Sequence, residues 1–145
     1  MSETDAMTSP RESTPILPKP FRLRGTGAVR LCGAGQLAFD LFGEGQVVIC
    51  LRRRAQVAFE GVGNRRDPGP DCMVLYGARG TLTVSGPDLD VEFRGGLVGV
   101  LAAGTFEVAL DGRGEIETPQ GDRTGWGLFP RTMHLGDPRP GQRAA

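Results

Sequence analysis

Three consecutive segments of this chain repeat one pattern with a ten-residue period. In Gly33–Leu41, Gly43–Leu51 and Arg53–Gly61, a small residue and Gln are followed by an aliphatic residue, Ala or Val, and Phe or Ile. Side chains alternate between the two faces of a β-strand, so an even period keeps equivalent residues on one face. The repeat therefore predicts two sets of residues that face the same core: Leu37, Val47 and Val57, and Phe39, Ile49 and Phe59.

Looser copies of the pattern flank these segments and extend the predicted β-structure over most of the chain. Polar and apolar residues alternate most regularly at Asp88–Phe93 and Thr105–Leu110, which is typical of strands with one wet face. The chain contains 23 glycines. We expect the Gly-x-Gly spacers to form tight hairpin turns, because glycine reaches the positive φ that such turns need. These features predict an all-β fold of about ten short strands.

Two arrangements of these strands fit the repeat. In an antiparallel meander, neighbouring units run in opposite directions and close into a sandwich or barrel. In a β-solenoid, which is the alternative, units wind in one direction and equivalent residues stack in ladders. The short spacers favour the meander. Gln36 and Gln56 distinguish the two, because a solenoid with two units per coil places them one strand spacing apart, at about 4.8 Å, whereas a meander places Gln46 between them.

The repeat also sets the domain boundaries. Residues 1–20 are polar and proline-containing, and they lack the apolar surface needed to offset the entropy of ordering, so we predict a disordered arm. Residues 21–129 form the all-β domain, and residues 130–145 are predicted to be a disordered tail. The chain has neither an apolar run long enough to span a membrane nor a signal-peptide core, which predicts a cytoplasmic protein.

The first repeat unit has a second interpretation. Gly33-x-Gly35-x-x-Ala38 follows an apolar run, as in a dinucleotide-binding loop. That loop must begin a helix, but Gly43-x-Gly45 interrupts the segment after about two turns, and typical helices are longer. Gly43-x-Gly45 also repeats the supposed signature. We therefore interpret the stretch as a turn followed by a strand, and a nucleotide-dependent enzyme is a remote alternative.

Five arginines form the candidate binding patch. They are Arg52, Arg53 and Arg54 at a strand end, and Arg65 and Arg66 in the predicted loop 61–71. This loop is the longest insertion in the repeat, and loops that interrupt a regular scaffold often carry function. It could present the arginines to a protein or a small anionic ligand. The solvated strand end, where charge discourages edge pairing, is the other interpretation of the triplet.

Acidic residues and the single tryptophan have structural interpretations. Asp88, Asp90 and Glu92 share one strand face, and alternating acids are typical of the wet face of an antiparallel sheet, with Arg94 available as a neighbour. Trp126 is predicted to close the core near the end of the domain rather than to stack on a ligand.

The chain has few residues that could act as a nucleophile, as its base or as a metal ligand. Cys32, Cys50 and Cys72 form no CxxC pair and are interpreted as three half-buried thiols. His134, the only histidine, falls in the predicted tail, so no Ser or Cys has an expected base. We therefore predict no catalytic residue, no cofactor and no metal site.

The charge balance limits the possible partners. Acidic and basic residues number 17 each, and no basic stretch is interleaved with aromatic residues, so no nucleic-acid partner is predicted. The repeated strands and the lack of catalytic candidates favour a non-catalytic module for self-assembly or scaffolding, in which sheet edges pair between copies or with another protein. The alternative function is a binding domain that presents the 61–71 loop.

Overall fold

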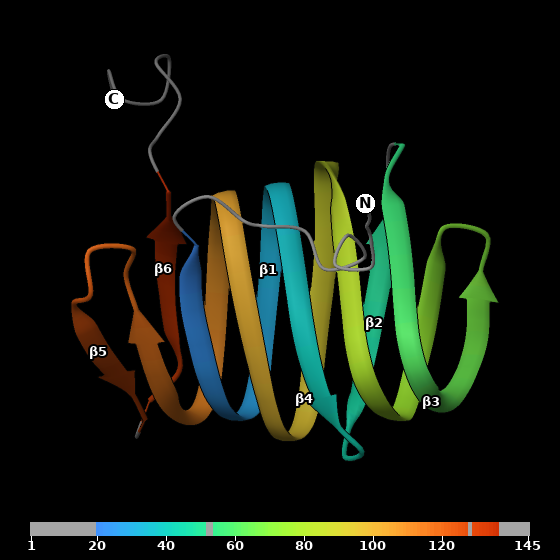
Figure 1. Ribbon diagram of the computed structural model, residues 1–145, viewed down its shortest axis with the longest axis horizontal. Helices are drawn as coiled ribbons and strands as arrows, with labels where there is room; N and C mark the ends of the chain where they lie inside the picture. Colours follow the sequence, from blue (N-terminus) through green and yellow to red (C-terminus); the bar gives the residue numbers. More distant parts are fainter. Residues whose placement is uncertain (1–19, 52–53, 128, 137–145) are drawn as a thin grey trace, which may run out of the picture.

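The computed structural model describes residues 20–51, 54–127 and 129–136 as an all-β fold (Figure 1). The described ranges contain no helical segment with the length and hydropathy needed to cross a bilayer. The fold class predicted from the repeat is confirmed. The strands are β1 (Phe21–Phe42), β2 (Gln46–Leu51), β3 (Gln56–Gly69), β4 (Cys72–Glu117), β5 (Arg123–Trp126) and β6 (Arg131–Leu135).

The described chain has six strands, so the prediction of about ten is wrong. β1 is 22 residues long and β4 is 46 residues long, because both continue through glycines that were expected to end a strand. Gly33 and Gly35 lie within β1, so the hairpin predicted there does not form. The supposed nucleotide loop does not form either, since the residues that would begin its helix are part of the same strand.

β4 pairs with every other strand of the sheet. Leu31 of β1 lies between Val91 and Val108, and the partner numbers fall as those of β1 rise, so the two strands are antiparallel. Along β2 the partner numbers in β4 also fall as those of β2 rise, and Val47 lies between Leu75 and Phe93. The chain winds outward along β1, β2 and β3 and returns along β4, whose turns lie between those of the outgoing chain (Figure 1).

This winding corrects both predicted arrangements. Antiparallel pairing is confirmed, but β4 lies between β1 and β2, so sequence neighbours do not form a meander. Gln36 and Gln56 both pair with Ser85, so they are two strand spacings apart, and the simple solenoid is wrong because the returning chain separates successive turns. Closure into a barrel is also wrong, because β3 lies at one end of the coil and β5 and β6 lie at the other (Figure 1).

The sheet extends beyond the predicted boundary at residue 129. β6 pairs with Phe106–Leu110 of β4, and Leu135 is buried in the core. The remainder of the predicted tail, 137–145, lies outside the described residues. The predicted arm also lies outside them, apart from Pro20.

The core lies between the front and back limbs of the coil (Figure 1). The residues predicted to share its face do so: Leu37, Phe39, Val47 and Ile49 are buried, and Val57 and Phe59 pack against them. Val57 and Phe59 are less buried because they belong to β3, the last strand at one end. The even period thus identified the inward face correctly, although the number of strands differs.

Glycines lie opposite one another where the long strands bend. Gly35 pairs with Gly104, and both have positive φ, at 143° and 128°. A methyl group on Gly35 would overlap the carbonyl oxygen of Ala103, and one on Gly104 would overlap that of Ala34. The two backbones therefore approach more closely than any other residue allows, and the hydrogen-bonded sheet bends without a break.

Three glycine-to-alanine variants separate the strain of positive φ from the overlap. Gly69 has no atom within 4 Å of an added methyl group, so Gly69→Ala should leave the free energy of unfolding within about 0.5 kcal/mol. Gly121 has φ +96° and the same open space, so Gly121→Ala should cost about 1–2 kcal/mol. Gly35→Ala should cost about 1–3 kcal/mol more than Gly121→Ala, because overlap adds to strain. Urea unfolding measures all three, and equal losses for Gly35→Ala and Gly121→Ala would contradict the close approach.

Candidate functional site: the open sheet edge at β3

The two ends of the coil differ in how they meet solvent. At one end the last strands are short, with four residues in β5 and five in β6. Trp126 and Leu135 from these strands are buried and cover that end of the core. The prediction that Trp126 closes the core is therefore confirmed. Short outer strands offer little edge for another chain to pair with.

The other end is the 14-residue strand β3, which pairs with β4 on one side and has no further strand partner within the described part of the chain. An open groove of about 530 Å³ lies here, and its apolar lining includes Val57, Phe59, Met73 and Leu75. Val62, on the same strand, is 70% exposed. The apolar interior of the coil therefore reaches solvent beside an unpaired strand.

The two halves of β3 differ. From Gln56 to Val62 the pairing with β4 is regular, and it shifts between Val62 and Asn64. Beyond the shift, Arg65 forms an ion pair with Asp67 (Nε–Oδ1 3.0 Å), and Pro68 follows. Irregular pairing, charge and proline all discourage the addition of another strand. The open part of the edge is therefore Gln56–Gly61, which we call the edge segment.

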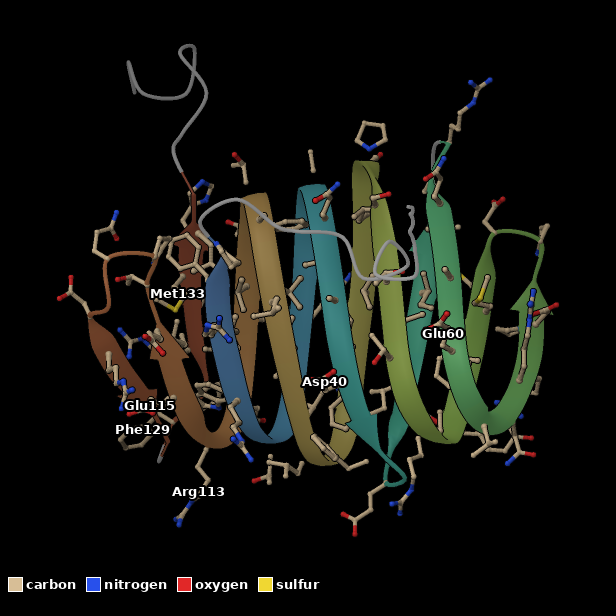
Figure 2. All side chains as sticks on the ribbon, in the orientation of Figure 1. Asp40, Glu60, Arg113, Glu115, Phe129 and Met133 are labelled. Atoms are coloured by element: carbon tan, nitrogen blue, oxygen red, sulfur yellow. A yellow bond between two sulfur atoms is a disulfide. The ribbon has the colours of Figure 1, made fainter. Side chains whose placement is uncertain are left out.

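The edge segment presents two distinct faces. Val57 and Phe59 point toward the core and are half-buried. Gln56, Ala58 and Glu60 alternate with them and are exposed on the outer face, where Figure 2 labels Glu60. This alternation is that of an ordinary sheet strand with one buried face, and the edge segment lacks only a neighbour on its outer side.

The predicted loop 61–71 is not a loop. Residues 61–69 belong to β3, because they pair with the start of β4, for example Arg65 with Leu75. Only Pro70 and Asp71 form the turn that joins β3 to β4. The predicted loop is wrong because the glycines and prolines of this segment do not end the strand: the returning chain supplies it with a partner.

The candidate arginine patch is divided between two parts of β3. Arg52 and Arg53 lie outside the described residues. Arg54 is exposed just before the edge segment, whereas Arg65 and Arg66 lie beyond the bend, on the other limb of the strand (Figure 1). The nearby Asp67 carboxylate offsets the charge of Arg65. The described arginines therefore do not form one continuous patch.

Two of the three cysteines form a disulfide. Cys50 of β2 lies directly opposite Cys72 of β4, and the two are bonded. The prediction of three half-buried thiols is therefore wrong for this pair, because sequence spacing alone did not reveal that β2 and β4 would lie side by side. Cys32 is a free, half-buried thiol.

Cys32 belongs to a charged cluster on the outer face of the sheet. The guanidinium of Arg30 binds the carboxylate of Asp90 through two contacts, of 3.0 Å and 2.8 Å. The Cys32 thiol donates to the same carboxylate at 3.4 Å. Burial raises the pKa of the Cys32 thiol, and the negative charge of Asp90 raises it further. The hydrogen bond and charge of Asp90 raise the pKa of Arg30. A thiol held in its protonated form is a weak nucleophile.

His134 lies in the sheet, and its predicted place in a disordered tail is wrong. It is in β6, opposite Glu107, which in turn lies opposite Cys32. Cys32 and His134 both line a groove of about 340 Å³, but the strand that carries Glu107 separates them by two strand spacings, roughly 10 Å. This distance is too long for the histidine to take the thiol proton directly. No group of three or more potential ligands in the described ranges could hold a metal ion.

The acidic residues of the outer face have arginine neighbours, as predicted for a wet sheet face. Glu92 forms an ion pair with Arg94 (3.0 Å), and Glu117 approaches Arg123 at 4.0 Å. The pairs are partly exposed, so each contributes little to stability. Their arrangement is that of a solvated face, with cross-strand and local partners.

Replacing Asp90 with Asn tests the cause of the raised Cys32 pKa. Asp90→Asn removes the negative charge beside the thiol, so the pKa of Cys32 should fall and alkylation by iodoacetamide at pH 8 should become faster. Cys32 is the thiol that reacts, because Cys50 and Cys72 are bonded to each other. The pH profile of the alkylation rate measures the shift.

The control is Glu92→Gln, which removes an acid from the same face that forms an ion pair with Arg94. Its alkylation profile should stay close to that of the unaltered protein. An unchanged profile in Asp90→Asn would show that burial alone sets the pKa of Cys32.

Comparison of the chain with protein-family models, with curated proteins and with solved structures finds no match. Function is therefore inferred from the surfaces of this molecule, and the β3 edge is the surface that departs most from a closed sheet.

Proposed function

We propose that the protein is a non-catalytic module for self-assembly or scaffolding, and that it acts through the edge of β3. One observation carries this proposal: a regular strand segment, Gln56–Gly61, has no outer strand partner in the described structure while the apolar groove beside it is open. Unpaired edges are templates for another chain, and native proteins usually blunt them.

The physical basis of the assembly is completion of the sheet. An added strand would receive backbone hydrogen bonds from the edge segment and would cover Val57 and Phe59. Burial of their remaining apolar surface would contribute about 25 cal/mol per Å² before the cost of association. A second copy of the chain and another protein could both supply this strand.

Several further predictions belong to this proposal. We further propose that the glycine-punctuated, ten-residue repeat builds the two limbs of the coil, and that this coil is the scaffold that holds the edge in place. The raised pKa of Cys32 and its distance from His134 support a role other than catalysis. The proposed cytoplasmic location would require the Cys50–Cys72 pair to persist in a reducing compartment, where disulfides are rare.

The alternative function, binding through residues 61–71, receives less support. Those residues are held in a strand rather than displayed in a loop. The carboxylate beside Arg65 also weakens any attraction for an anion. We therefore place self-assembly first.

A lysine on the outer face of the edge segment tests the proposal. Ala58 is exposed, so Ala58→Lys should leave the fold intact but weaken strand addition, because charge on an edge opposes pairing. We expect the unaltered protein to associate with rising concentration, and Ala58→Lys to need a higher concentration to associate, in size-exclusion chromatography with light scattering.

Ala109→Lys is the matched control. Ala109 is also exposed, but it lies inside the sheet, between Arg30 and Thr132. This variant should associate like the unaltered protein. A protein that stays monomeric at high concentration without any substitution would contradict self-assembly.

A further inference from the structure

We infer that the partner of the edge segment is the same segment of a second copy, in an antiparallel pair that places Ala58 opposite Ala58 and closes a two-fold dimer. The inference rests on the proposed self-assembly and specifies its partner, its register and its size.

The outer face of the edge segment is complementary to itself in this register. With Ala58 on the two-fold axis, Gln56 of one copy lies opposite Glu60 of the second copy, and the reverse pair is equivalent. The Gln56 amide can donate a hydrogen bond to the Glu60 carboxylate, so each exposed polar side chain meets a suitable partner. Ala58, between them, is small enough to face itself without overlap.

The inner face is complementary in the same register. Val57 of one copy lies opposite Phe59 of the second copy, and pairs of a β-branched and an aromatic side chain are favourable across antiparallel strands. These two residues line the open groove together with Met73 and Leu75. The pairing would therefore join the apolar interiors of two coils across the shared edge.

Features beyond the C-terminal end of the edge segment limit the length of the pairing. The shift between Val62 and Asn64 ends the regular strand, and the Arg65–Asp67 ion pair follows it. A slip of one residue would place Val57 and Phe59 on the wrong face. Gly61 lies at the bend of the sheet, opposite Gly80, so the straight part of the edge segment is Gln56–Glu60. These five residues are centred on Ala58, and pairing along their full length gives the proposed register.

The opposite end of the coil explains why the assembly stops at two copies. Figure 2 shows Glu60 near one end and Phe129 and Met133 near the other. The far end has short strands and a core covered by Trp126 and Leu135. β3 provides the long regular edge in the described part of the chain, and a self-complementary contact through it closes at two copies, whereas a filament needs two complementary surfaces.

A charge exchange tests the register. Gln56→Glu would place like charges opposite each other at two equivalent positions, and the dimer dissociation constant should rise roughly 2- to 30-fold. The double variant Gln56→Glu with Glu60→Gln restores a complementary pair and should return the constant to near its original value. Sedimentation at several concentrations, in low salt, measures each constant.

Recovery of the dissociation constant in the double variant would report a contact between two copies and not a contact within one molecule. Gln56 pairs with Ser85, and Glu60 pairs with Thr81 of the same chain. The two side chains are four residues apart on one strand, about 13 Å, and do not meet within a single molecule. A second substitution that merely restored folding would not reverse a change in the association constant, which circular dichroism and the melting temperature would check separately.

Disulfide trapping tests the two-fold axis directly. In a Cys32→Ser background, Ala58→Cys should form a covalent dimer under mild oxidation, because residues directly opposite on antiparallel strands lie within disulfide distance. Ala109→Cys is the control, since Ala109 is exposed but has strand partners on both sides. It should remain monomeric on a non-reducing gel.

The outcomes distinguish the inference from the proposed function. A dimer that shows trapping at position 58 and rescue by the double variant supports both. A dimer that is insensitive to Gln56→Glu and is not trapped overturns this register but leaves self-assembly standing, and so does a larger assembly. A protein that stays strictly monomeric overturns both the register and self-assembly. If the backbone amides of the edge segment also resist hydrogen exchange in that monomer, another part of the chain covers the edge, and both are again overturned.

Discussion

The close approach of two backbones at paired glycines is the contact on which the rest of this structure depends. At Gly35 and Gly104, and at Gly61 and Gly80, the sheet bends with glycine opposite glycine. Any side chain there would overlap a carbonyl oxygen of the facing strand. Because the bend needs no break in pairing, β1 and β4 pass through it as continuous strands. The outgoing and returning chains can then alternate along one coil.

An alternating coil of this kind has two ends, and only one of them presents a long, regular strand edge in the described structure. One end is covered by the short strands β5 and β6 and by the buried Trp126. At the other end, β3 is an outer strand with half-buried Val57 and Phe59 beside an open groove. Half of that strand is protected by irregular pairing and by an ion pair, and the other half is regular. Another strand can therefore add only along the short segment Gln56–Gly61, and this restricts the register of the added strand.

The polar groups of the outer face stabilise the sheet locally and hold its side chains in defined states. Asp90 binds Arg30 through two contacts and accepts a hydrogen bond from Cys32. The same carboxylate opposes ionisation of the thiol, and burial does so more strongly. The cluster thus keeps Cys32 protonated while it pairs two strands that are far apart in sequence. Its chemistry is that of a cross-strand contact.

The sequence by itself determined which residues face inward, because alternation along a strand is a local property. The even repeat identified Leu37, Val47 and Val57 as core-facing, and the acids beside Arg94 as a wet face. Register between distant segments is not local, since it depends on how the whole chain winds. Only the tertiary structure therefore decided that Ser85 separates Gln36 from Gln56, that Cys50 meets Cys72, and that His134 joins the sheet opposite Glu107. The open edge at β3 follows from the same winding, because which strand comes last in a coil is set by the path of the chain.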